Sequence, residues 1–253
     1  RLSYNKIELE DYLDAIGPRP EVSGSSGNQI GVIVARGIIL DGDQPAGRIG
    51  GDSLGDIIRD ARNKPDVKAL VLRLDTNGGS SFASEVVRRE LELTRLAGKP
   101  VVVSMGSAAA SGGYWIATAA DEIWAAPTTL TGSIGIFGAF ATFEESLAKL
   151  GVHNDGVGTN QLSDAFIASR ALNPQLSAAM QQITERGYRV FLDKVAEGRK
   201  MSLEAVDKIA QGRVWTGESA HKLGLVDKLG NLDDAVGAAA KLAGLSEYGV
   251  IHL

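Results

Sequence analysis

The sequence contains no cysteine, only three histidines and no excess of basic residues. Without cysteine, the chain cannot form a disulfide, a thiolate nucleophile or a cysteine-ligated metal site. The histidines (His153, His221 and His252) are scattered, which argues against a histidine-rich metal centre, although carboxylates alone can hold a hard cation. Lys plus Arg total 26 against 31 Asp plus Glu, a net charge of -5 that disfavours a broad nucleic-acid-binding surface. We therefore expect no metal, no other cofactor and no nucleic-acid partner.

Charge is nearly absent between residues 100 and 143, where only Asp121 and Glu122 are ionised. The two uncharged runs have about the length of a membrane span. Their many glycines and nine serines and threonines would make poor lipid-facing helices, so we predict a buried, tightly packed layer instead. Phe137, Phe140 and Phe143 are expected in the core, with an apolar groove as the alternative.

Proline is scarce, with 7 residues, whereas glycine reaches 31 of 253. Excess glycine in a chain with 44% hydrophobic and 23% charged residues indicates many tight turns and close backbone approaches. The first residues are charged and lead into GPRP and SGSSG, without the apolar segment of a signal peptide. We predict a linker or arm over residues 1–27 and one domain over residues 28–253.

Apolar strand patterns alternate with amphipathic helix patterns along the chain. Strands are expected over residues 31–36, 67–74, 101–105, 122–125 and 133–137. Helices are expected over residues 53–64, 84–97, 111–119, 143–150, 174–199, 202–211 and 232–243, with a loop over 106–110. This alternation predicts an α/β fold of βαβ units with a mostly parallel sheet and additional carboxy-terminal helices.

Two loops with unusual composition follow strands whose carboxyl ends would form the ligand-binding edge of such a sheet. In the first, residues 75–80 (DTNGGS), Gly78 and Gly79 can expose consecutive N–H groups, although a simple turn explains them equally well. The second, residues 106–115 (GSAAASGGYW), resembles a small-x-Ser-x-Gly nucleophile turn around Ser111. Taken alone, Ser111 is better explained as a helix N-cap. Taken together, Gly112 and the glycine pair would supply the two N–H donors that an oxyanion needs.

A serine nucleophile also requires a base, and the sequence offers only weak candidates. His153 has Asp155 and Asp164 nearby in sequence, but a histidine in a surface loop is the preferred interpretation. Lys149 ends the S-x-x-K sequence SLAK, yet the companion motifs of penicillin-binding enzymes are absent. A charged helix face explains Lys149 better.

Three segments carry a resemblance to a known family: residues 75–79 (DTNGG), 110–115 (ASGGYW) and 131–135 (TGSIG). They resemble the signal peptide peptidase A (protease IV) family, most closely the carboxy-terminal half of its long tandem-domain form. The resemblance implies a ClpP/crotonase-like fold of repeated ββα/βαβ units. It also implies a Ser-Lys peptidase that degrades released signal peptides or other apolar peptides, on the external (periplasmic) side of the cytoplasmic membrane, as a ring-like homo-oligomer.

The resemblance also implies roles for individual residues. Ser111 matches the family nucleophile, and Gly78, Gly79 and Gly112 match the oxyanion-binding segments. Thr76 and Asn77 stand where the family usually has Ser-Pro.

The general base is the larger departure from the family pattern. Single-domain members carry a catalytic lysine beyond the serine, but the matching residues 156–169 (GVGTNQLSDAFIAS) contain none. In the tandem form, the lysine comes from the amino-terminal half. We therefore expect an incomplete enzyme whose partner is that half, attached to the membrane through a segment outside this chain. The alternatives are a crotonase-like acyl-CoA-binding enzyme and a non-catalytic scaffold half of an oligomeric protease.

Overall fold

A computed structural model describes residues 27–160, 162–163 and 165–253. The predicted linker therefore lies outside the described residues except for Gly27, and so does Asp164.

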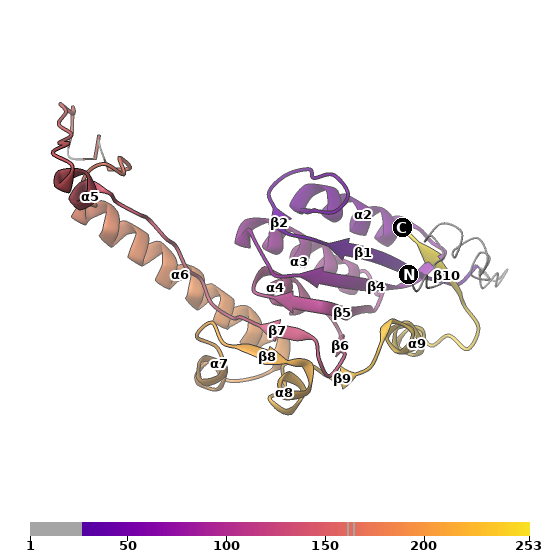
Figure 1. Ribbon diagram of the computed structural model, residues 1–253. Helices are drawn as coiled ribbons and strands as arrows, with labels where there is room; N and C mark the ends of the chain where they lie inside the picture. Colours follow the sequence, from indigo (N-terminus) through magenta and orange to yellow (C-terminus); the bar gives the residue numbers. More distant parts are fainter. Residues whose placement is uncertain (1–26, 161, 164) are drawn as a thin grey trace, which may run out of the picture.

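An eight-stranded sheet forms the centre of the molecule (Figure 1). Its main path runs in the order β10-β1-β4-β5-β6-β9, and every pair along it is parallel. β7 pairs parallel with the end of β5 and antiparallel with β8, while β2 and β3 form a separate parallel pair. The strands are β1 (Gln29–Arg36), β2 (Ile39–Leu40), β3 (Ile49–Gly50), β4 (Val67–Thr76), β5 (Val101–Ala110), β6 (Glu122–Ala125), β7 (Leu130–Gly132), β8 (Val214–Thr216), β9 (Lys228–Leu229) and β10 (Gly249–His252).

Helices cover both faces of the sheet, which explains why its central strands are almost continuously apolar. In β4, Leu70, Leu72 and Leu74 point into a core shared with α2 and α3, whereas Ala69 and Val71 face α9. The helices are α2 (Gly51–Asn63), α3 (Ser81–Leu96), α4 (Gly112–Ala117), α5 (Glu144–Lys149), α6 (Pro174–Arg199), α7 (Leu203–Ile209), α8 (Gly217–Lys222) and α9 (Leu232–Leu242).

The α/β class and the mostly parallel sheet are confirmed, but two local predictions are wrong. The predicted loop over residues 106–110 is strand, because β5 continues to Ala110 by pairing with β7. The predicted strand over residues 133–137 is not formed; the strand is β7, and Ser133 leaves it with a positive φ of 49°. Sequence patterns did not reveal the short strands β8, β9 and β10 either.

An arm projects from the sheet after β7, formed by α5, the chain that follows it and the amino-terminal part of α6 (Figure 1). The buried residues of α6 are Phe191, Leu192 and Val195, all near its carboxyl end. Phe137 is 91% exposed and Phe143 is 54% exposed, so the predicted core positions are wrong for both. The reason is that the chain has left the sheet before it reaches them. Phe140 is half-buried in an edge-to-face contact with Phe166.

No helix among the described residues combines the length and the apolar character needed to cross a bilayer.

Candidate active site

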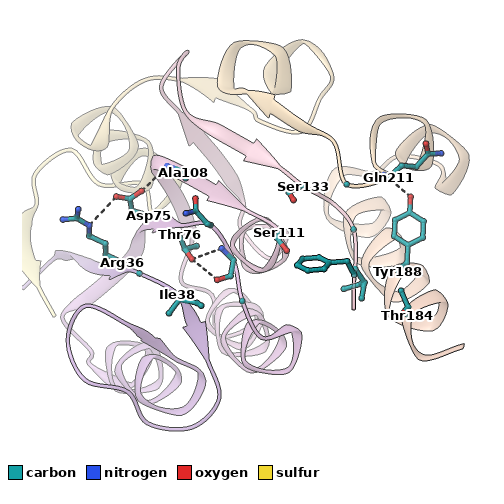
Figure 2. Close-up of a pocket in the computed structure, with 18 of the residues that line it drawn as sticks. Arg36, Ile38, Asp75, Thr76, Ala108, Ser111, Ser133, Thr184, Tyr188 and Gln211 are labelled. Atoms are coloured by element: carbon teal, nitrogen blue, oxygen red, sulfur yellow. Dashed lines mark hydrogen bonds and ion pairs between the residues drawn. The ribbon is translucent and has the colours of Figure 1, made fainter. Parts of the chain in front are cut away.

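A cleft of about 1080 Å³ lies where β4 and β5 end, and Figure 2 shows the residues that surround it. One wall comes from the sheet and its loops, and the other from the chain after β7, from α6 and from the turn before β8. The lining residues are Arg36, Gly37, Ile38, Asp75, Thr76, Asn77, Gly78, Gly79, Ala108, Ser111, Ser133, Gly135, Ile136, Phe137, Thr184, Glu185, Tyr188, Gln211 and Gly212.

Ser111 occupies the sharp turn between β5 and α4. Its φ of 52° and ψ of -119° match the first central residue of a type II′ turn, a position that favours glycine. The turn is held by the Ser111 N–H, which donates to the Gly132 carbonyl at 2.9 Å, and by the Trp115 N–H, which donates to the Ser111 carbonyl at 2.9 Å. Although Ser111 is at the N-cap position, its side chain makes no capping hydrogen bond. The hydroxyl therefore does not serve the helix and lines the cleft.

The Gly78–Gly79 loop packs directly against this turn. A Cβ on Gly78 would lie 2.7 Å from the Ser111 Cβ, so no side chain fits there, and the φ of 108° at Gly78 also favours glycine. The Gly78 N–H donates to the hydroxyl oxygen of buried Thr76 at 3.0 Å. A threonine thus shapes the loop beside Ser111. The two predicted loops meet in space.

The N–H of Gly79 is directed away from β2. Gly79 forms a parallel bridge with Ile39, in which the Ile39 N–H donates to the Gly78 carbonyl and the Ser80 N–H donates to the Ile39 carbonyl. Alternate residues of extended backbone direct their N–H groups to opposite sides, so the Gly79 N–H lies on the side opposite β2. Its nitrogen lies 3.4 Å from the position of a Cβ on Gly112. Gly112 begins α4, and its N–H has no partner within the helix.

The opposite wall brings Ser133 and Tyr188 to the cleft, and sequence reasoning assigned neither of them a role. Figure 2 shows the Ser133 hydroxyl on the same cleft as Ser111. The Tyr188 hydroxyl donates to Asp207 at 2.5 Å and accepts from the Gln211 N–H at 3.1 Å. Burial and the hydrogen bond to Asp207 raise the pKa of Tyr188. The Tyr188 side chain is therefore held in place and stays neutral, and it forms part of the cleft wall. No sequence motif indicated this role.

Residues 94–246 match the sequence pattern of peptidase family S49. The chain belongs to this family.

Relatives at high identity include two proteins called Protease 4. The one from Salmonella typhi is 55% identical over 97% of this chain and 39% of its own length. The one from Haemophilus influenzae is 46% identical over 94% of this chain and 38% of its own length. "Serine protease SPPA, chloroplastic" from Arabidopsis thaliana is 35% identical over 95% of this chain and 36% of its own length. The chain thus spans well under half the length of these relatives.

Solved structures with the same fold include two proteases. A point mutant of ClpP1 from Listeria monocytogenes superposes with a TM-score of 0.54 at 13% identity, covering 81% of this chain and 94% of the other. A point mutant of the 1510-N membrane-bound stomatin-specific protease superposes with a TM-score of 0.57 at 15% identity, covering 89% of this chain and 97% of the other. The ClpP-like fold and the similarity to the protease IV family are confirmed.

The two weak candidates for a base within this S49 chain are not brought to the cleft. Lys149 is exposed at the end of α5, and exposed His153 follows α5 in the arm, which Figure 1 shows projecting away from the sheet. Among the described residues that line the cleft, Arg36 is the only basic one. An arginine stays protonated in proteins and cannot act as a base.

Metal ligands do not gather in the described part of the chain, where no cluster of three or more His, Asp or Glu side chains is placed to hold an ion.

Proposed function

We propose that this chain is the nucleophile-bearing half of a serine endopeptidase that cleaves apolar peptides, including released signal peptides. The observation that carries the proposal is Ser111, held in a glycine-favouring conformation with its hydroxyl free of the helix cap, beside the Gly78–Gly79 loop. Ile38, Ile136 and Phe137 line the same cleft and supply apolar surface for such a substrate.

In the proposed reaction, the Ser111 Oγ attacks the carbonyl carbon of the scissile peptide bond and passes its proton to a neutral lysine. The developing oxyanion accepts hydrogen bonds from the N–H groups of Gly79 and Gly112. Gly78 belongs to this oxyanion-binding segment through its close approach to Ser111, since its own N–H is bonded to Thr76. The lysine then protonates the leaving amine, and water hydrolyses the acyl-enzyme.

The lysine would come from the amino-terminal half of the same protein. Two observations support this: residues 156–169 contain no lysine, and Arg36 is the only basic residue among the described lining of the cleft. Membership of family S49 favours this peptidase over a crotonase-like acyl-CoA-binding enzyme or a non-catalytic scaffold half.

We further propose the setting that the related proteases suggest. The complete protein would be attached to the cytoplasmic membrane by a segment outside this chain, act on its external side and assemble as a homo-oligomer. The long arm would provide surface for contacts between subunits.

A fluorophosphonate tests both the nucleophile and the missing base. We expect intact-mass labelling of Ser111 in the full-length protein, no labelling of its Ser111→Ala variant, and little or no labelling of this chain alone. Hydrolysis of an apolar peptide by full-length Ser111→Ala should fall by at least about a thousandfold, since removing the nucleophile leaves only binding and oxyanion stabilisation.

Two results would contradict the proposal. Unchanged hydrolysis by full-length Ser111→Ala would remove Ser111 from the mechanism. Stoichiometric, Ser111-dependent labelling of this chain alone would show a base within it, and Lys149→Ala and His153→Ala would then be compared.

A further inference from the structure

β5 carries an irregular insertion three residues before Ser111. Leu74 pairs with Met105 and Thr76 pairs with Ala109, so the single residue Asp75 of β4 faces residues 106–108 of β5. Two extra residues therefore bulge out of the ladder. The N–H groups of a bulge lose their partners on the neighbouring strand, and something else must hold its shape.

The Asp75 carboxylate fills this bulge. Its Oδ1 accepts from the Ala108 N–H at 3.1 Å, and Figure 2 shows this hydrogen bond together with the ion pair to Arg36. A Cβ on Gly106 would lie 2.8 Å from the Asp75 Cβ and Cγ. Gly106 therefore leaves the space that the carboxylate occupies.

A second β4 side chain holds the beginning of the bulge. The Arg73 Nη1 donates to the Met105 carbonyl at 2.7 Å and to the Ser104 Oγ at 3.0 Å. Residues 73 and 75 lie on the same face of β4 because successive side chains of a strand alternate. One face of β4 thus presents a donor to one end of the bulge and an acceptor to the other.

We propose that Arg73 and Asp75 form a bulge clasp that positions Ser111 against the Gly78–Gly79 loop. The inference rests on the proposed peptidase function and adds two positioning residues to it. Neither side chain needs to touch the substrate, since both act through the β5 backbone.

The strand register after the bulge decides whether Ser111 lies against the Gly78–Gly79 loop. β7 pairs with β5 from Ala108, the last bulge residue, through Ala109 and Ala110, and Ser111 follows at once. A slip of one residue in a strand turns every following side chain to the other face. Without the bulge clasp, Ser111 would lose its close approach to Gly78, and the N–H donors would no longer converge on the reacting carbonyl.

Asp121 provides a matched control at the opposite end of β5. Its Oδ2 accepts from the Val101 N–H at 2.9 Å, and its Oδ1 pairs with the Arg95 Nε at 2.7 Å. The side chains of Asp75 and Asp121 are exposed to the same extent, 29% and 28%. Each carboxylate thus holds one β5 N–H and one arginine, but only Asp75 lies near Ser111.

The test compares Asp75→Ala, Asp75→Asn and Asp121→Ala in the full-length protein, with hydrolysis of an apolar peptide as readout. Asp75→Ala should lower kcat by about 10- to 100-fold with little change in KM, the cost of misplacing a reacting group by about 1 Å. Asp75→Asn keeps the acceptor oxygen and should restore most of kcat. Asp121→Ala should keep kcat. Hydrogen exchange at the Ala108 amide should rise in Asp75→Ala alone.

The other outcomes distinguish failure of the bulge-clasp proposal from failure of the proposed peptidase function. Faster exchange at Ala108 with wild-type kcat would reduce the bulge clasp to a structural role and overturn the proposal. An equal loss of kcat in Asp121→Ala would attribute the effect to general destabilisation of β5 and overturn it too. If Ser111→Ala, measured in parallel, retains hydrolysis, the proposed peptidase function itself fails. If Ser111→Ala loses hydrolysis while Asp75→Ala keeps full kcat, the bulge-clasp proposal is wrong and the proposed peptidase function still holds.

Discussion

Ser111 has a strained backbone conformation that its neighbours hold in place. Its positive φ forces the Cβ close to the backbone, which costs a residue other than glycine about 1–2 kcal/mol. The Gly132 carbonyl and the start of α4 hold the turn in place against this strain. Such strain is typical of functional sites, where it directs a side chain outward from a rigid element.

Substitutions of Ser111 should reveal this cost directly. Ser111→Gly and Ser111→Ala both remove the hydroxyl, but only glycine removes the Cβ as well. We expect Ser111→Gly to have a free energy of unfolding about 1 kcal/mol higher than that of Ser111→Ala, measured by urea denaturation. Equal stabilities, or a more stable alanine variant, would mean that the turn is not strained.

At the level of elements, an ionic contact joins α2 to α3. Glu90 of α3 is almost fully buried and accepts hydrogen bonds from Arg59 and Arg62 of α2, at 2.8 and 2.7 Å. Burial by itself would raise the pKa of Glu90, but the two arginines outweigh it and lower the pKa below its usual value near 4.5. Glu90 therefore remains ionised in the folded chain under conditions in which it is protonated in the unfolded chain.

The lowered pKa of Glu90 predicts how acid destabilises the fold. The contribution of Glu90 is fully present above about pH 4.5 and is lost as the pH falls through the lower folded pKa. Glu90→Gln should therefore flatten the fall of the free energy of unfolding between about pH 5 and pH 3. Urea denaturation across this range measures the slope, with Glu247→Gln on the exposed turn before β10 as control. An unchanged slope in Glu90→Gln would contradict the prediction.

A second set of contacts joins α4 to α3 and α6. Trp115 of α4 packs against Phe191 of α6 in a tilted ring contact, with the centroids 4.7 Å apart, and its Nε1 donates to Glu85 of α3 at 2.7 Å. Glu85 is also bound by Arg88, a buried arginine. The helix that begins beside Ser111 is therefore fixed to the base of the arm.

At the scale of the whole molecule, the arm carries exposed apolar surface among the described residues. It exposes large apolar side chains, including Leu150 at 78% and Ile183 at 72%. Apolar surface gathered on a projecting element is typical of a protein–protein contact. This agrees with the proposal that the full-length protein assembles into an oligomer through the arm.

Charged substitutions on the arm should weaken that assembly. We expect full-length Leu150→Glu and Ile183→Glu to sediment at a mass lower by about twofold or more, because a buried unpaired carboxylate opposes subunit contact. Leu242→Glu, on the exposed side of α9, is the control and should keep the parental mass. Parental mass in both arm variants would exclude the arm from the interface.

The local features of the fold could be predicted from the sequence because they depend on short-range patterns. Alternating apolar runs and amphipathic segments identified the parallel α/β sheet, and the two glycine loops together indicated Ser111 as a candidate nucleophile. The phenylalanines of the arm were misjudged because their apolar character suggests burial, while their actual exposure depends on where the chain leaves the sheet.

By itself, then, the sequence determined the α/β class, the candidate serine and the glycine loop, since each depends on neighbours a few residues apart. Only the tertiary structure decided that the Gly78–Gly79 loop packs against Ser111, that Arg73 and Asp75 hold the backbone of the β5 bulge, and that Tyr188 lines the cleft. These relations join residues distant in the sequence. They follow from strand register and helix packing, which no local pattern of residues specifies.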